Sequence, residues 1–239
     1  MSKKIYLSPS NQDGNMYATD RKVSEMEQCN KFANAAKIAL ERCGFEVKKA
    51  QEGQKMSVSI AESNAWGADL HIPIHTNACT NNGTGTAGGT IVFVYSTADN
   101  ANMALAAPIY KAVQAVTPGK TEYGVRAFPD LAELNGTNCT AVYIEVDFHD
   151  NPPIAKWLME NTQTVGEAIA KGVCEGYGVK YVPPTSATTA TAGKTDTGKS
   201  GTFYRVQVGA FSDKTLAEHL LQAVQKKGFP YAFIVEVKK

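Results

Sequence analysis

The sequence predicts an α/β protein: a mostly parallel sheet with helices on both faces, followed by a small C-terminal β-α-β module. Apolar runs rich in Val, Ile and Tyr alternate along residues 1–182 with amphipathic stretches of helical period, a pattern typical of parallel sheets covered by helices. Residues 183–201 are rich in Thr, Ala, Gly and Ser and show no apolar periodicity. We therefore expect a main domain at 1–182, a flexible linker at 183–201 and a tail module at 202–239.

The elements of the main domain follow in chain order. Strands are predicted at the runs KKIYLS, FEVKKA, ADLHIPIH, TIVFVYS and AVYIEVDF. Helical spacing of apolar residues predicts helices at residues 24–43, 57–66, 100–116 and 153–177. Gly44 ends the first of these helices, and Ser24 with Glu27 three residues later forms a capping-box pattern at its start. Functional side chains of such sheets gather at the carboxyl ends of the strands, so we expect the site there.

Composition and charge exclude several classes of function. The formal net charge is +1 over 239 residues, so the chain lacks the electrostatic footprint of a nucleic-acid-binding protein. No apolar run approaches the ~20 residues of a membrane span, and the basic start MSKK is not followed by the apolar segment of a signal peptide. The five cysteines are scattered without a CxxC pair, which favours reduced thiols. We expect a chain that is made in the cytoplasm.

Two histidines, His71 and His75, lie on one predicted strand. They share a face of that strand but are ~13 Å apart at ~3.3 Å per residue, too far to share a metal whose bonds to imidazole are ~2 Å long. His75 sits at the carboxyl end of the strand, before a polar loop, whereas His71 is in mid-strand. His75 is therefore the candidate ligand, and His71 is expected to be a packed, hydrogen-bonded core histidine.

Acidic residues at two places complete the candidate site. Glu145 lies near the end of the strand AVYIEVDF, where a buried carboxylate is costly without a function. The alternative for Glu145 is an ordinary strand-end charge that faces solvent or an arginine. At the head of the first helix, SEMEQCN, the capping box accounts for Glu27 and leaves Glu25 unexplained.

The segment ESNAWGADLHIPIHTNA resembles the signature N-A-x-x-A-D-x-x-x-S-I-H-x-N-A of zinc-dependent N-acetylmuramoyl-L-alanine amidases of the type 3 family. IEVDFHDN resembles the family's late strand, V-E-x-x-F-x-x-N, and the likeness covers about residues 3–180. The resemblance implies that His75 and Glu25 are zinc ligands, with Glu27 as the second choice, and that Glu145 is the catalytic carboxylate. It also implies cleavage of the amide bond between N-acetylmuramic acid and L-alanine of the peptidoglycan stem peptide.

One ligand of the family is unmatched. Where the family has a histidine after Pro-Gly, this chain reads SPSNQDG, with Asn11 in that place. Three arrangements stay open: Asn11 or Asp13 ligates weakly, His149 replaces the missing imidazole, or no metal binds. Zinc prefers Cys, His and carboxylate ligands to an amide oxygen. His149 follows Glu145 in the next loop, and its alternative interpretation is a solvated loop histidine.

Two functions follow from these residues and from the resemblance. The first is a zinc hydrolase that degrades peptidoglycan, in which zinc polarises the amide carbonyl and lowers the pKa of water toward ~7 while Glu145 moves the proton. Its setting resembles that of a phage endolysin, made in the cytoplasm and acting on the cell wall after release. The alternative is a metal-free peptidoglycan-binding protein on an amidase-like scaffold, which the missing histidine favours.

The tail carries a second resemblance. YRVQVGAF alternates as a strand does, Ser212 is placed to cap a helix at about residues 213–228, and FPYAFIVEV predicts a second strand. The run YRVQVGAFSDKTLAEHLLQAVQKKGF resembles the first half of a SPOR domain, which implies peptidoglycan as the partner. One β-α-β unit has exposed edges and a small core, so we expect it to dock on the main domain or to pair two chains as a homodimer. His219 is expected on the surface of the helix.

Overall fold

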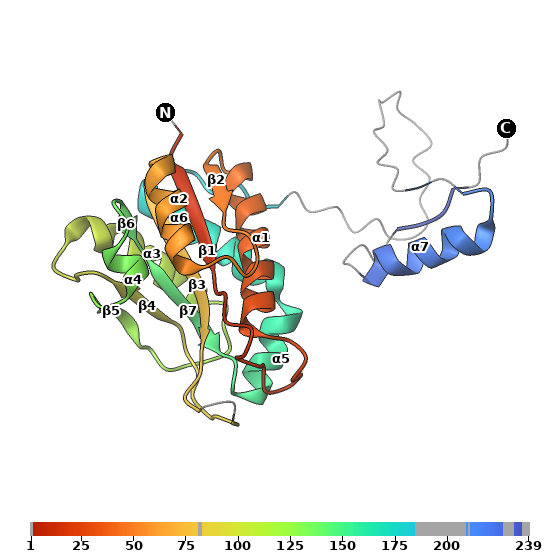
Figure 1. The fold of residues 1–239 in the computed structure, drawn as a ribbon, viewed down its shortest axis with the longest axis horizontal. Coiled ribbons are helices and arrows are strands. Elements are labelled where there is room, and N and C mark those ends of the chain that lie inside the picture. Colours follow the sequence, from red (N-terminus) through yellow and green to blue (C-terminus); the bar gives the residue numbers. More distant parts are fainter. Residues whose placement is uncertain (1, 81–82, 185–208, 210, 227–231, 236–239) are drawn as a thin grey trace. The chain divides into compact units, whose positions relative to one another are not determined.

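A sheet with the strand order β2-β1-β3-β7-β4-β5, and with β6 beside β3, forms the centre of the first unit in this computed structural model (Figure 1). The structure describes residues 2–80, 83–184, 209, 211–226 and 232–235. The chain divides into two compact units, residues 1–185 and 186–239, and each is considered by itself. The strands are β1 (Lys4–Pro9), β2 (Glu46–Lys49), β3 (Leu70–Asn77), β4 (Ile91–Val94), β5 (Gly124–Ala127), β6 (Thr140–Ala141) and β7 (Tyr143–Phe148).

The sheet is mostly parallel, which confirms the predicted fold class. β1 pairs in parallel with β2 and β3, and β3 pairs in parallel with β6 and β7. β4 is antiparallel to β7 and parallel to β5. The segment between β3 and β4 contains no helix among its described residues, and a helix is the usual crossover that returns a strand in the parallel direction. The reversal of β4 was not predicted.

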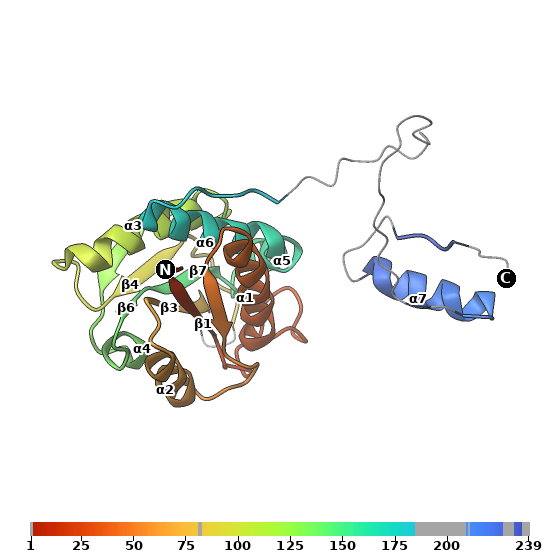
Figure 2. The same ribbon diagram turned by 90° about the horizontal axis from the view of Figure 1, so that it is seen from above.

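Helices cover both faces of the sheet, as predicted (Figure 2). α1 (Glu25–Arg42), α3 (Asn100–Gln114) and α6 (Thr162–Tyr177) pack together on one face, and α2 (Met56–Trp66) and α4 (Ala132–Asn135) lie on the other. The helix predicted at 153–177 is two helices, α5 (Pro152–Glu160) and α6. Asn161 separates them because its φ of −116° and ψ of 33° leave the helical region, and its amide Nδ2 donates to Trp157 O at 2.8 Å.

The main hydrophobic core lies between the sheet and the layer of α1, α3 and α6. Strand residues such as Leu7, Ile74 and Ile144 are fully buried there. Two glycines let α6 approach its neighbours closely. A Cβ atom at Gly166 would lie 2.4 Å from Cβ of Ala35 in α1, and one at Gly172 would lie 2.5 Å from Cα of Ile109 in α3. A larger side chain at either position would push the helices apart.

The second unit contains the helix α7 (Lys214–Lys226), close to the predicted range. Its first turn is capped by Asp213, whose Oδ1 accepts hydrogen bonds from Thr215 N at 2.7 Å and Leu216 N at 3.3 Å, and not by Ser212 as predicted. An aspartate carboxylate also suits the positive end of the helix dipole. His219 is exposed, as predicted. The predicted strand YRVQVGAF, residues 204–211, lies outside the described residues apart from Gly209 and Phe211, and residues 232–235 of the second predicted strand are described without strand pairing.

Candidate active site

Three of the predicted site residues meet near the carboxyl end of β3, where the middle of β7 lies beside it. His75 of β3 and Glu145 of β7 are direct register partners, so their side chains leave the same face of the sheet. Glu25 is the first residue of α1. Its neighbour Glu27 is used by the predicted capping box, in which Glu27 N donates to Ser24 Oγ and Ser24 N donates to Glu27 Oε2, both at 3.2 Å. The cap fixes the start of α1 and thereby the position of Glu25.

Glu25 and His75 form a buried pair. Nδ1 of His75 lies 2.8 Å from Oε1 of Glu25, and the exposed fractions of His75 and Glu25 are 7% and 2%. Burial alone would raise the pKa of Glu25, but the hydrogen bond and the charge of His75 outweigh it and lower that pKa. Burial would likewise lower the pKa of His75, but the hydrogen bond and the charge of Glu25 raise it. The pair is therefore stabilised as an ion pair.

The carboxyl group of Glu145 differs from that of Glu25 in its hydrogen bonding and in its pKa. Its Oε2 is buried and has no hydrogen-bond partner among the described residues. Burial raises the pKa of Glu145 to about 8, with the charge of His75 opposing this shift and that of Glu25 adding to it. Two carboxyl groups with divergent pKa values in one site are a usual sign of different acid–base roles.

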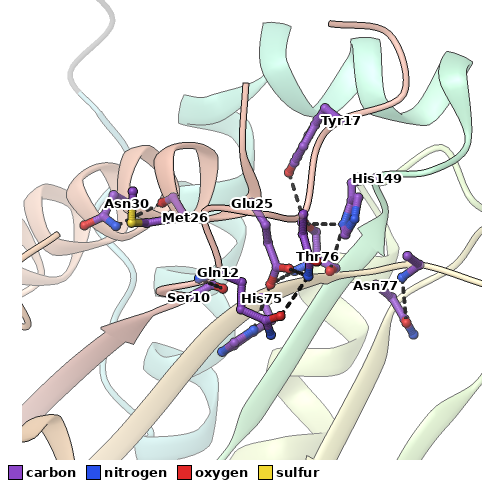
Figure 3. Close-up of polar contacts among 12 residues, drawn as sticks. Ser10, Gln12, Tyr17, Glu25, Met26, Asn30, His75, Thr76, Asn77 and His149 are labelled. Atoms are coloured by element: carbon purple, nitrogen blue, oxygen red, sulfur yellow. Dashed lines mark hydrogen bonds and ion pairs between the residues drawn. The ribbon is translucent and has the colours of Figure 1, made fainter. Parts of the chain in front are cut away.

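Several residues that the sequence did not single out hold Glu25 in place (Figure 3). Asn15 Nδ2 donates to Glu25 Oε2 at 2.8 Å, and Thr76 N donates to Oε1 at 3.4 Å. The Thr76 hydroxyl lies 3.2 Å from the hydroxyl of Tyr17. The sequence gives one signal for these residues, which is that Thr76 directly follows His75. Asn15 and Tyr17 belong to the irregular segment before α1, where no periodicity identifies them.

The candidates for a third ligand lie elsewhere, and one of them, Asp13, is exposed. Asn11 is exposed, and its Nδ2 donates to Gln54 O at 3.1 Å. His149 is buried, stacks on Tyr17 with 5.3 Å between ring centroids, and holds its Nδ1 2.9 Å from Thr76 O and 3.0 Å from the Thr76 hydroxyl. Burial lowers the pKa of His149. A neutral ring that donates from Nδ1 to a carbonyl keeps its lone pair on Nε2, but Thr76 separates this ring from His75 (Figure 3).

The donor set fits zinc in type and is one ligand short in number. A histidine nitrogen and a carboxylate oxygen are ligands that zinc prefers, and His75 and Glu25 already converge. Catalytic zinc sites use three protein ligands. Within the described ranges, no three His, Cys, Asp or Glu side chains are grouped so that they could hold a metal ion. The roles of these residues in metal binding therefore stay a proposal.

His71 is a buried, hydrogen-bonded histidine, as predicted. It is fully buried, its ring stacks on Tyr6 with 5.3 Å between centroids, and its Nε2 lies 3.1 Å from Oε1 of Glu133. Ser8 donates from its hydroxyl to the same oxygen. These contacts form a second polar cluster on β3, in which His71 Nδ1 is buried without a hydrogen-bond partner among the described residues.

Two further carboxylates that sequence reasoning missed fix the loops next to the site. Asp147 accepts hydrogen bonds from Gly89 N at 2.8 Å and Gly119 N at 2.9 Å. Asp150 Oδ2 accepts from Cys79 N, Thr80 N and the Thr80 hydroxyl, each at 2.9 Å. The loop that follows His75 is thus fastened to the end of β7.

Comparison with known sequences shows two families along the chain. The profile of the N-acetylmuramoyl-L-alanine amidase family matches residues 9–175, and the SPOR domain profile matches residues 184–236. The SPOR match begins inside the segment predicted as a linker. A search of curated proteins finds no significant match. None of the described helices is long and apolar enough to cross a membrane.

Solved structures of amidases share the fold of the first unit. The catalytic domain of CwlV, an N-acetylmuramoyl-L-alanine amidase from Bacillus (Paenibacillus) polymyxa, superposes with a TM-score of 0.66 at 20% identity, over 74% of this chain and 99% of that one. An N-acetylmuramoyl-L-alanine amidase from Clostridium difficile 630 gives 0.65 at 17% identity, over 74% and 97%. The catalytic domain of the CD27L endolysin gives 0.58 at 24% identity, over 72% and 96%. Together with the profile match, which spans most of the chain, these findings show that the chain belongs to the N-acetylmuramoyl-L-alanine amidase family.

Proposed function

We propose that the first unit is a peptidoglycan amidase that cleaves the bond between N-acetylmuramic acid and L-alanine, with Glu145 as the general base and with His75 and Glu25 as zinc ligands. The family supports the reaction, and the Glu25–His75–Glu145 arrangement supports the roles. The single observation that carries the assignment is the unpartnered, buried Oε2 of Glu145 beside the Glu25–His75 pair, within the part of the chain that the structure describes. A carboxylate kept without a partner at such a position is free to exchange a proton with a substrate or a water.

Glu145, Glu25 and Tyr143 have different roles in the proposed reaction. Glu145 takes a proton from the attacking water and delivers it to the nitrogen of L-alanine as the amide bond to the lactyl carbonyl breaks. Its pKa of about 8 lies near the working pH of most proteins, which suits a group that accepts and then donates a proton. Glu25 fixes the orientation of the His75 ring, and Tyr143 supports that ring from one side at 4.5 Å between centroids.

Zinc is the cofactor that the family and the donor types favour. When bound by His75 and Glu25, it would polarise the scissile carbonyl. Asn11 and His149 remain the candidates for a third ligand, and either would have to leave its present partner, Gln54 O or Thr76, to reach the metal.

A second function is favoured by the missing third ligand. A metal-free protein of this fold would bind stem peptides in the same place without cutting them. In that case Glu145 would only accept a hydrogen bond from the bound peptide. The two functions differ in whether new amino termini appear on peptidoglycan.

The proposal also includes a role for the SPOR domain and the place where the protein acts. The SPOR domain would hold the enzyme on peptidoglycan, which is the expected partner of both units. We place the action of the protein on the cell wall after its release from the cytoplasm, in the manner of an endolysin. Pairing of two chains through the tail as a homodimer stays a prediction.

The test is digestion of purified peptidoglycan by the full chain, with free amino termini and the released peptides identified by mass spectrometry. Peptides that begin with an unblocked L-alanine, produced by the wild type and not by Glu145→Gln, would support the amidase. A Glu122→Gln variant is the matched control, because it makes the same substitution at an exposed position. Binding of peptidoglycan with no new amino termini would establish the metal-free binder instead.

A further inference from the structure

A straight row of four residues crosses the sheet from the site to its edge. His75 of β3 pairs with Glu145 of β7, Glu145 pairs with Ile91 of β4, and Ile91 pairs with Gly124 of β5. Partners in register present their side chains on the same face. The row therefore runs from the proposed zinc ligand across the general base and an apolar side chain, and it ends at a residue with no side chain.

Arg126 lies near the end of this row, two residues after Gly124 on β5. It is the register partner of Phe93 on β4, and Phe93 contacts Tyr143, which in turn stacks on His75, so Arg126 lies on the same face as the site. Its Nε donates to Tyr123 O at 3.1 Å, and its guanidinium lies 5.5 Å from the centre of the Tyr123 ring. The side chain thus folds back along its own strand, past Gly124.

Gly124 leaves room for this arrangement. Its φ is +76°, and no described atom lies within 4 Å of the place that a Cβ would occupy. A side chain there would fill the space between Ile91 and the guanidinium, and a positive φ is unfavourable for residues other than glycine. The end of the row is consequently open.

The guanidinium is oriented but not neutralised. Arg126 is exposed, and among the ion pairs of the described residues none includes it. Holding an arginine in one geometry by stacking and by its Nε leaves the terminal N–H groups free to grip a carboxylate in the two-pronged manner that arginine favours. Gly124 is two strands away from Glu145, about 10 Å at the usual strand spacing.

We propose that Arg126, stacked on Tyr123 near Gly124, binds the free α-carboxylate of the stem-peptide residue that follows L-alanine and so selects substrates in which that group is not amidated. The inference rests on the proposed function, since it orients the same bond against Glu145. The positive charge of Arg126 also indicates in which direction the peptide would run across the sheet. Arg126 would draw the peptide carboxylate along the apolar floor of Ile91 and Phe93, away from the buried carboxyl groups of Glu25 and Glu145.

The experiment compares two soluble substrates that differ in one group. N-acetylmuramoyl-L-alanyl-D-glutamate carries a free α-carboxylate on its glutamate, and the corresponding D-isoglutamine compound carries an amide there, while both keep the γ-carboxylate. We expect the wild type to prefer the acid by about 10- to 100-fold in kcat/KM, the range of a charge-assisted hydrogen bond. Arg126→Ala should lose this preference by slowing cleavage of the acid alone. Lys111→Ala, which removes an exposed positive charge on α3, should keep it.

Equal use of both substrates by the wild type would overturn the proposal, as would an equal loss on both in Arg126→Ala. If the wild type cleaves neither compound, the proposed amidase fails and the role of Arg126 is still tested by calorimetric binding of the same pair. Tighter binding of the acid that disappears in Arg126→Ala would then support a carboxylate site. Equal affinities for the acid and the amide would reject it.

Discussion

β3 carries two histidine–glutamate pairs four residues apart, and only one of them is placed for chemistry. His71 with Glu133 and His75 with Glu25 are both buried, with nitrogen–oxygen distances of 3.1 Å and 2.8 Å. Ser8 donates to Glu133 of the pair at His71, and Tyr6 stacks on its ring, although His71 Nδ1 has no hydrogen-bond partner among the described residues. The pair at His75 lies at the end of the strand and faces Glu145, a second carboxyl group whose buried oxygen has no partner among the described residues. Identical residue types thus serve stability or chemistry according to what lies next to them.

The two pairs should differ most in kcat when a glutamate of each region is replaced by glutamine: Glu145 beside the pair at His75, and Glu133 in the pair at His71. Glu145→Gln should lower kcat by about 10²- to 10⁴-fold, the usual contribution of a general base. Glu133→Gln should leave kcat within a few fold, because the Glu133 carboxylate is hydrogen-bonded to Ser8 and His71 and its charge acts on His75 less than those of Glu25 and Glu145. Both are measured as amino termini released per enzyme per second. Equal losses would mean that the pair at His71 also takes part in catalysis.

The pair at His71 should show its role in stability. His71→Asn removes the ring that stacks on Tyr6 and leaves Glu133 without one of its partners, at a cost of about 1–3 kcal/mol. For a unit of this size each kcal/mol lowers the thermal midpoint by about 2–4 °C. Calorimetry of the full chain would show a drop of several degrees with kcat nearly unchanged. A loss of activity without a loss of stability would contradict the comparison.

The pH dependence should separate Glu145 from its neighbours. Its pKa is raised in the folded protein to about 8, from an ordinary value of 4.5, so the folded state holds a proton that the unfolded state releases between these two values. Stability from this group is therefore complete below about pH 4.5 and is lost as the pH rises toward 8. In chelator-treated protein, the thermal midpoint of the wild type should fall relative to Glu145→Gln as the pH increases from 5 to 8. A constant difference would show that Glu145 is not buried in the folded protein.

The smallest effect is expected at Asn11. Its amide donates to Gln54 O at the surface, so Asn11→Ala should change kcat/KM by less than about twofold, within the range of surface substitutions. Gln54→Ala serves as a control for the local loop. A loss of tenfold or more would instead place Asn11 at the metal and require the segment before α1 to move.

Local sequence patterns predict the centre of the site but not its surroundings. The strand ADLHIPIH and the capping box at Ser24 are local patterns, so they suffice to place His75 at a strand end and Glu25 at a helix start. Asn15 and Tyr17 have no such pattern, because they lie in an irregular segment whose contacts with Glu25 and Thr76 are set only by folding. The row from His75 to Gly124 depends on β4 lying antiparallel beside β7, and no pattern in β4 itself specifies its neighbours.

Zinc per chain, measured by elemental analysis together with hydrolysis on the same samples, tests the central claim most directly. We predict close to one zinc in the wild type, loss of both zinc and hydrolysis in His75→Ala and in Glu25→Ala, and retention of both in His71→Asn. Loss in His149→Ala as well would identify the third ligand. A wild type that takes up no zinc when the metal is offered, or that hydrolyses peptidoglycan equally well without it, would contradict the proposed site.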